Sequence, residues 1–175
     1  GYFPSNIEYS VGTGDWKTVE ANEEVTFGGA NGTLRLRGTN IKGTASAWYA
    51  YSTITFTDKN VNVACTGDIR TLLNWENYST VDTQNARFCN LFKGCSVLTS
   101  APELPATKLA DNCYYNMFES CINLTSAPEL KATTLAESCY ENMFFGCTRL
   151  TSAPELKATT LATSCYKKMF YGCTS

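Results

Sequence analysis

Nine cysteines in a chain of 175 residues carry the most reactive side-chain chemistry of this sequence. Seven of them form two series with the same constant spacing: Cys95, Cys121, Cys147 and Cys173, and Cys113, Cys139 and Cys165. Thiols can form disulfides, bind metals or act as nucleophiles. Because each member occupies an equivalent position among apolar neighbours, we expect free, buried thiols that pack as small hydrophobic side chains.

Disulfides and metal binding are the alternative interpretations of these cysteines. A bridge within one repeat, such as Cys139 to Cys147, would span about 12 Å if the intervening segment were helical, which exceeds bridging geometry. Bridges between adjacent repeats are feasible, although three equivalent cysteines cannot all pair within one series. The chain has no His and no CxxC pair, so zinc is disfavoured. We therefore expect no metal and no cofactor.

The composition also argues against catalysis. Without His, a Ser or Cys nucleophile would need another base, and the chain has no G-x-S-x-G motif and no Gly-rich phosphate loop. We expect a non-enzymatic protein without catalytic residues. Fourteen basic and sixteen acidic residues give a net charge of −2 without a polybasic run, so nucleic acid is not an expected partner. No stretch approaches the ~20 apolar residues of a transmembrane helix.

The cysteine spacing reflects an internal repeat. The segment LTSAPEL begins at Leu98, Leu124 and Leu150, and this interval is the same as that of the cysteines. A fixed period of about 20 to 29 residues is typical of leucine-rich arrays, in which each copy covers the apolar surface of its neighbour. An imperfect copy precedes the regular ones, and we expect an atypical capping unit within residues 66–97.

Each copy is predicted to contain a short strand, a turn and a short helix. Leu124 and Leu130 flank Pro128, which favours a short extended stretch. Apolar residues then recur at i, i+4 and i+8, namely Leu135, Cys139 and Met143. This spacing predicts a short helix that ends near Gly146.

Residues 1–62 are predicted to form a small antiparallel β domain. The expected strands are NIEYSV, WKTV, EVTF, TLRLRG and AWYAYSTITF, with turns that contain Gly12 and Asn31-Gly32. The last of them is predicted to be one strand with Trp48 and Ile54 on one face and Tyr49 and Tyr51 on the other. The expected fold class is α+β, with this domain followed by a right-handed leucine-rich-repeat solenoid over residues 63–175.

The repeat sequence resembles a known family. CYENMFFGCTRLTSAPELKATTLA, with its MFxGC core, is similar to the BspA-like leucine-rich repeats of bacterial cell-surface proteins, and the resemblance covers about residues 88–175. It implies that the repeat Cys and Phe side chains lie inside the array. It also implies an exported bacterial protein, anchored at the envelope, that takes part in adhesion to host matrix proteins or other cells.

The ligand surface is expected on side chains that recur as outward columns across the repeats. These candidates are Thr99, Thr125 and Thr151; Ser100, Ser126 and Ser152; and Glu103, Glu129 and Glu155. They would offer hydroxyls and carboxylates to an extracellular protein partner. The alternative is a solvated edge on which Lys131 and Lys157 neutralise the glutamates.

A second hypothesis is a carbohydrate-binding module. Tyr49, Tyr51 and Trp16 would then stack on a glycan, and the repeats would serve as a stalk. The tyrosines that follow the Cys113 series, Tyr114, Tyr140 and Tyr166, are interpreted as packing along the flank of the helix. The sequons at Asn31, Asn77 and Asn123 are assigned no role.

The two ends of the sequence suggest a piece of a longer protein. The chain starts at Gly1, which suggests that an export signal has been removed. Its last residues, YGCTS, correspond to FGCTR at 145–149, so the array is expected to be open before the next strand. We expect either further repeats or end-to-end self-association at that edge.

Overall fold

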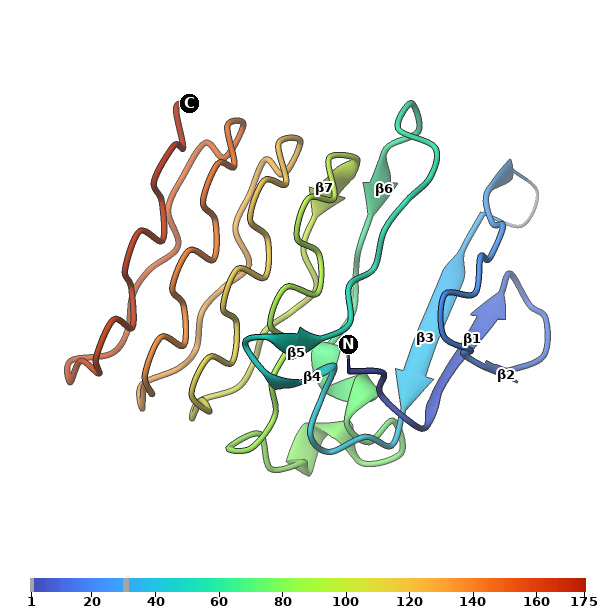
Figure 1. Ribbon diagram of the computed structural model, residues 1–175, viewed down its shortest axis with the longest axis horizontal. Helices are drawn as coiled ribbons and strands as arrows, with labels where there is room; N and C mark the ends of the chain where they lie inside the picture. The colour runs from blue at the N-terminus through green and yellow to red at the C-terminus, as the bar shows by residue number, and fades with distance from the viewer. Residues whose placement is uncertain (1, 30–31) are drawn as a thin grey trace.

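The computed structural model describes residues 2–29 and 32–175, so the predictions for Gly1 and Asn31 lie outside the described residues. A three-stranded sheet lies at one end of the molecule and a row of stacked coils at the other (Figure 1). A short hairpin and a segment with two 3-10 helices lie between them. One hydrophobic core is continuous from Ile7 in the sheet to Met169 in the last coil.

The N-terminal sheet has the order β2-β1-β3, with β1 at Ile7–Val11, β2 at Lys17–Thr18 and β3 at Leu34–Gly38. All pairs are antiparallel, and Glu8 lies opposite both Thr18 and Arg37. Ile7 and Tyr9 are buried and Glu8 between them is partly exposed, whereas Ser10 is buried as well. The strands predicted in NIEYSV, WKTV and TLRLRG are confirmed.

Two other strand predictions are wrong. EVTF forms no strand, and β3 pairs with β1 instead. AWYAYSTITF is not one strand, because β4 at Ala45–Ala47 and β5 at Ala50–Tyr51 form an antiparallel hairpin that turns at Trp48 and Tyr49. Beyond the hairpin, Ile54 and Phe56 are partly buried against the core, whereas Trp48, predicted on the same face as Ile54, is exposed.

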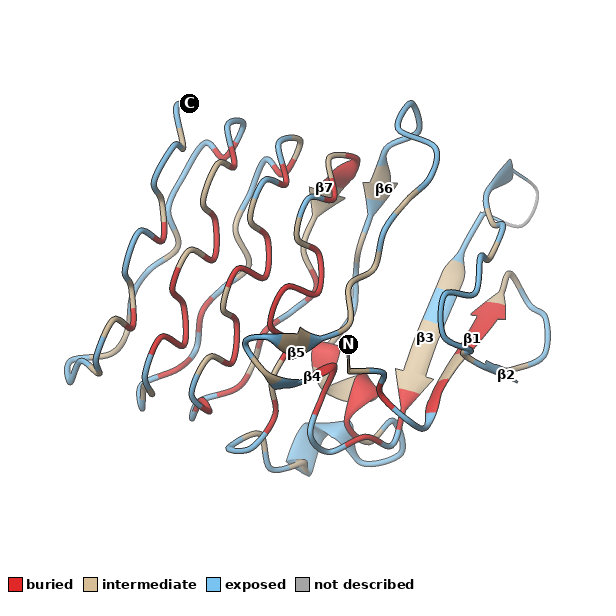
Figure 2. Ribbon diagram, viewed as in Figure 1, coloured by how far each residue is buried: buried red, intermediate tan, exposed pale blue. Residues whose placement is uncertain are grey.

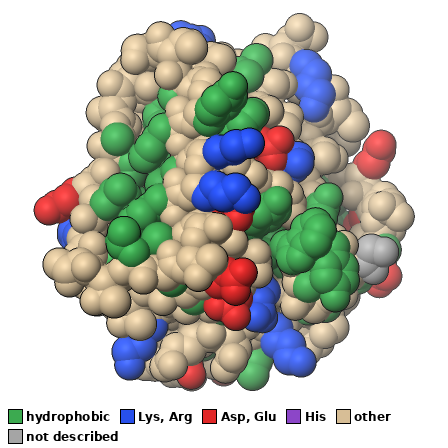
Figure 3. Space-filling model, turned by 60° about the vertical axis from the view of Figure 1, so that its left-hand side comes forward, with side chains coloured by type: hydrophobic (Ala, Val, Ile, Leu, Met, Phe, Trp, Pro, Cys, Tyr) green, Lys and Arg blue, Asp and Glu red, His purple; other side chains and the backbone are tan. Residues whose placement is uncertain are grey.

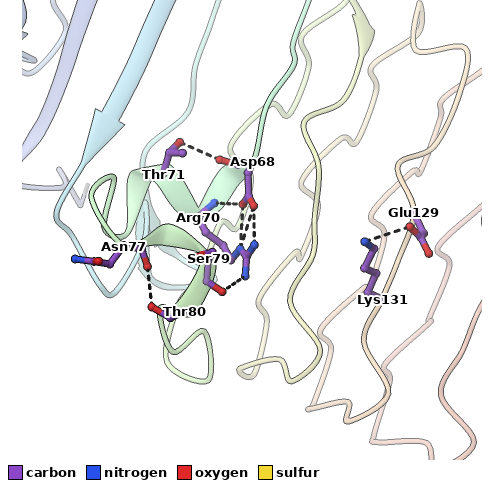
Figure 4. Close-up of polar contacts among 8 residues, drawn as sticks. All are labelled: Asp68, Arg70, Thr71, Asn77, Ser79, Thr80, Glu129 and Lys131. Atoms are coloured by element: carbon purple, nitrogen blue, oxygen red, sulfur yellow. Dashed lines mark hydrogen bonds and ion pairs between the residues drawn. The ribbon is translucent and has the colours of Figure 1, made fainter.

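The segment between the sheet and the coils is fixed by a polar cluster. Strand β6 at Val63–Ala64 pairs in parallel with β7 at Leu98–Ser100. Two 3-10 helices follow β6, η2 at Ile69–Leu72 and η3 at Tyr78–Thr80. Asp68 caps η2 by accepting from the Arg70 amide, and its carboxylate pairs with the Arg70 guanidinium at 2.7 Å. Arg70 Nη1 donates to the Ser79 carbonyl at 3.1 Å, which ties η3 to η2 (Figure 4).

The predicted fold class is contradicted in the repeats. None of the described residues forms an α-helix, and copies two and three contain isolated parallel bridges instead of strands, for example Leu104 to Leu130. The segment predicted to be helical is a series of tight turns. A leucine-rich-repeat solenoid of strand plus helix is therefore the wrong description of this array.

A left-handed residue at every fourth position explains why no helix forms. Asn112, Asn116 and Ser120 have φ values of 57, 52 and 61°. In the next coil the corresponding conformation is adopted by Ser138, Asn142 and Gly146. Residues with positive φ interrupt an α-helix, and Gly, Asn and to a lesser degree Ser tolerate that conformation. Each such residue ends one turn and starts the next.

Backbone hydrogen bonds alternate between the turn and the neighbouring coil. The amides of Cys113 and Tyr115 donate within their own turn, to Ala110 and Asn112. The amides of the even-numbered residues in this segment donate instead to carbonyls of the next coil. For example, the Tyr114 amide donates to the Cys139 carbonyl at 2.8 Å. The same alternation recurs from Phe88 to Gly94 and from Ser138 to Gly146. Half of the amides therefore build the turn and half bind the next coil.

Side chains stack inside the coils at the same period. Phe92, Phe118, Phe144 and Phe170 form one column, with successive ring centroids 5.7 Å apart. Phe88, Tyr114, Tyr140 and Tyr166 form a second one. Tyr114 and Tyr140 are buried, so these tyrosines belong to the core, and the prediction that they pack along a helix flank is wrong. Figure 2 shows the buried residues running along the coils.

Candidate functional site

The predicted columns of Thr, Ser and Glu lie on the surface in part. Seven of the nine residues are exposed, and the exceptions are Thr99 and Ser100 in β7. The hydroxyl of Thr99 donates to the Val63 carbonyl at 3.2 Å, and that of Ser100 to the Cys65 carbonyl at 2.8 Å. These two hydroxyls therefore join β7 to β6 and are engaged within the protein.

Of the three glutamates in the column, Glu129 is the one that ion pairs neutralise. Glu129 pairs with Lys131 at 3.5 Å and with Lys157 of the next coil at 2.6 Å. The hydrogen bond from Lys157 lowers the pKa of Glu129. Figure 4 shows Glu129 and Lys131 side by side on their coil. This arrangement matches the alternative interpretation of a solvated edge, although Lys157 bonds across the coils.

The cysteines are free thiols packed in the interior. All six members of the two series from Cys95 to Cys165 are buried, and the prediction of buried thiols is confirmed for them. Burial raises the pKa of Cys139 to about 11 and that of Cys147 to about 12. Because the thiolate is the reactive form, these side chains are poor nucleophiles near neutral pH. Their arrangement suits packing rather than bond chemistry.

An exposed aromatic pair lies at the tip of the β4–β5 hairpin. The exposed fraction is 53% for Trp48 and 71% for Tyr49, and their rings meet edge to face at 5.4 Å. The Trp48 ring also approaches Tyr115 of the coils, with centroids 6.2 Å apart. Asn90 Nδ2 donates to the Trp48 carbonyl at 3.3 Å, which attaches the hairpin to the first coil. The turn therefore presents two large aromatic rings on a fixed support.

Charged side chains continue this surface across the coils. Lys93 pairs with Glu119 at 2.9 Å, and Lys167 pairs with Glu141 at 2.8 Å. The Glu141 carboxylate is mostly buried and also accepts from the Ser138 hydroxyl at 2.7 Å. The hydrogen bond between Lys167 and the Glu141 carboxylate raises the pKa of Lys167.

A shallow hollow of about 190 Å³ connects these charges, and Glu119, Glu141 and Lys167 line it together with Phe145. We call the combined region the mixed surface. It consists of Trp48, Tyr49, Lys93, Tyr115, Glu119, Glu141, Phe145 and Lys167. Figure 3 shows hydrophobic side chains beside acidic and basic ones on the face turned toward the viewer.

The two other aromatic candidates lie apart from each other. Tyr51 is exposed in β5, the second strand of the hairpin whose tip carries Trp48 and Tyr49. Trp16 lies on the N-terminal sheet, where the guanidinium of Arg37 stacks on its ring at 4.1 Å. Sequence reasoning singled out Tyr49 but missed Trp48 and the charged members from the coils. The available signal was that Tyr115, Glu141 and Lys167 occupy equivalent positions in successive repeats, so they would be expected to lie side by side.

Comparisons with known proteins return no relatives: no protein family, no curated protein and no solved structure matches the chain. Across the described part of the chain, no group of three or more Cys, Asp and Glu residues has an arrangement that could hold a metal ion. Within residues 2–29 and 32–175, no helix has the length and apolar character needed to cross a membrane.

Proposed function

We propose that this chain is a non-enzymatic binding protein, secreted or displayed on a bacterial surface, that docks an extracellular partner protein on the mixed surface. The observation that carries the proposal is the exposure of Trp48 and Tyr49 on a hairpin attached to the first coil. Tryptophan and tyrosine are enriched among the residues that dominate binding energy at protein interfaces.

The surroundings of the aromatic pair support a protein partner. Interfaces combine an apolar centre with a polar rim. The ion pairs of Lys93 with Glu119 and of Lys167 with Glu141 supply both signs of charge beside the rings. Charges of both signs favour a partner of complementary pattern over a uniformly charged polymer.

The proposed location outside the cell draws on the sequence. The repeat resembles BspA-like bacterial surface proteins, and adhesion to host matrix proteins or other cells is the role that the resemblance implies. The mixed surface lies outside the predicted Thr, Ser and Glu columns. Thr99 and Ser100 are engaged within the protein and Glu129 is neutralised.

Binding to a panel of extracellular matrix proteins, with a glycan array in parallel, tests this function. Trp48→Ala and Tyr49→Ala should each weaken protein binding about tenfold or more, because truncated anchor residues cost about 2 kcal/mol. Tyr78→Ala is the matched control, since Tyr78 is also an exposed aromatic but lies on η3. Glu155→Lys tests the predicted column and should leave binding unchanged.

Two outcomes would contradict the proposal. If Glu155→Lys abolished protein binding and Trp48→Ala did not, the contact would lie on the columns. If the chain bound glycans alone and lost them on Tyr49→Ala, the carbohydrate-binding module would be the correct function.

A further inference from the structure

The outer face of the N-terminal sheet holds a second group of aromatic and polar side chains, which the proposed function does not use. The Arg37 guanidinium lies between two indole rings, 4.1 Å from the centroid of Trp16 and 4.1 Å from that of Trp75. Arg37 Nε also donates to Glu8 Oε2 at 2.8 Å. Stacking on both sides and the ion pair together fix the orientation of the Trp75 ring.

The Trp75 backbone is held just as firmly. Its amide donates at 3.0 Å to the carbonyl of Gly38, the last residue of β3. The side chain is nevertheless 36% exposed. Because Arg37 covers part of the ring, the exposed remainder is a preorganised apolar plate beside a sheet.

A hollow of about 220 Å³ opens next to this plate. Its polar lining consists of Asn6, Glu8, Thr18 and Thr39, and Trp75 lines it on the apolar side. Three of these polar residues, Asn6, Thr18 and Thr39, are exposed. Ligand pockets for drug-sized molecules measure about 300 to 1,000 Å³. This hollow therefore suits a ligand of about one ring.

The donors and acceptors of the hollow indicate the chemistry of that ligand. Its lining offers a carboxylate, which accepts hydrogen bonds from hydroxyl groups, and an amide and two hydroxyls, which both accept and donate. The single charged group in the lining is Glu8, and its Oε1 accepts no hydrogen bond from the described residues. An anionic ligand would face this carboxylate without a cation in the lining, so a neutral ligand is favoured.

We propose that the hollow between Trp75 and Glu8 binds one pyranose ring of a neutral glycan. The ring would place its C–H face on the Trp75 indole and direct its hydroxyls to Glu8, Asn6, Thr18 and Thr39. This site is separate from Tyr49 and Tyr51 and does not depend on the mixed surface.

A titration observed by ¹H–¹⁵N NMR tests the site directly. The probes are the methyl glycosides of glucose, galactose, mannose and N-acetylglucosamine. At least one should shift the Trp75 indole N–H signal saturably, with a dissociation constant on the order of 1 mM, as expected for a small ligand with one stacking face. The Trp48 indole signal should not move.

Two variants distinguish specific binding from a general effect. Thr39→Tyr fills the hollow from an exposed position and should abolish the shift of the Trp75 signal. Glu8→Gln retains an acceptor for Arg37 but removes the charged acceptor and should weaken binding at least fivefold. Tyr78→Ala should bind as the unaltered chain does. Thr39→Tyr and Glu8→Gln both retain Trp75, so its indole N–H signal stays available as the readout.

The proposal is overturned if none of the four glycosides moves the Trp75 signal at about ten times the expected dissociation constant. It is also overturned if Thr39→Tyr binds unchanged. Its failure is distinguishable from failure of the proposed function, because Trp48→Ala leaves this hollow intact and Thr39→Tyr leaves the mixed surface intact.

Discussion

The thiol of Cys147 donates a hydrogen bond to the carbonyl oxygen of Phe118, 3.1 Å away in the preceding coil. The same bond joins Cys121 to Phe92 at 3.1 Å and Cys173 to Phe144 at 3.2 Å. The first member of the series, Cys95, bonds the Ile54 carbonyl at 2.8 Å, beyond the β4–β5 hairpin. These cysteines therefore combine a small apolar volume with a donor directed at the previous coil, which explains their period.

Replacing Cys147 by alanine should lower the free energy of unfolding by about 1 to 2 kcal/mol, because a buried atom and a weak hydrogen bond are lost together. Cys173→Ala is the matched control, since Cys173 makes the same bond but is only half-buried. Its loss should be smaller. Urea unfolding followed by circular dichroism measures both variants. Equal losses would show that burial does not govern the contribution of this series.

The stability of the protein should fall as the pH rises above about 8.5. In the unfolded chain the thiols ionise near that value. Burial raises the pKa of Cys89 to about 12 and that of Cys139 to about 11, so the folded chain keeps protons that the unfolded chain loses. Each such thiol lowers the free energy of unfolding by up to about 1.4 kcal/mol per pH unit in this window.

Urea unfolding at pH 7, 8, 9 and 10 measures this dependence. Stability should be level up to the ordinary thiol pKa and decline steadily above it. The Cys147→Val variant, which removes one buried thiol, should show a shallower decline. A free energy of unfolding that stays constant from pH 7 to 10 would contradict the prediction.

Ser120→Gly should stabilise the protein by up to about 1 kcal/mol, because glycine relieves backbone strain. Ser120 has a φ of 61°, and the equivalent residues of the other coils are Gly94, Gly146 and Gly172. A Cβ costs about 1 to 2 kcal/mol in this conformation, which glycine avoids at some cost in entropy of the unfolded chain.

The matched control for this substitution is Ser120→Ala, which removes the hydroxyl but keeps the Cβ. It should not raise the midpoint of thermal unfolding, whereas Ser120→Gly should. Gly146→Ala should lower the midpoint of thermal unfolding, because Gly146 has a φ of 70°. Space is not the cause, since the nearest atom to an added Cβ, the Ser120 hydroxyl oxygen, is 3.6 Å away. Equal midpoints for the glycine and alanine variants of Ser120 would disprove backbone strain at this position.

Much of the N-terminal sheet and the buried repeat positions could be predicted from the sequence. A hairpin loop predicted β1, alternation predicted β3, and the repeat period predicted six of the buried cysteines, although Cys89 outside the series is also buried and Cys173 within it is only half-buried. The helix prediction failed because an apolar residue at every fourth position fits a chain of four-residue turns as well as a helix. The discriminating signal was the series Ser138, Asn142 and Gly146, residue types that accept positive φ at the same interval.

The candidate sites were less predictable. Trp48 and Tyr49 were placed on opposite faces of one strand, because the sequence between Ala47 and Ala50 contains no Gly, Asn or Pro to indicate a turn. Arg37 and Trp75 lie far apart in the sequence and meet without any repeat to relate them. Such contacts depend on tertiary structure and leave no periodic signal.

The division of amides between turn and neighbouring coil limits how the array can change in size. The coils donate their even-numbered amides to carbonyls of the next coil, their rings stack on the equivalent rings, and their thiols donate to carbonyls of the preceding coil. An insertion or deletion of a few residues would put both sets out of step at once. Removing or duplicating one whole repeat keeps both sets aligned. The array can therefore become longer or shorter only by whole repeats.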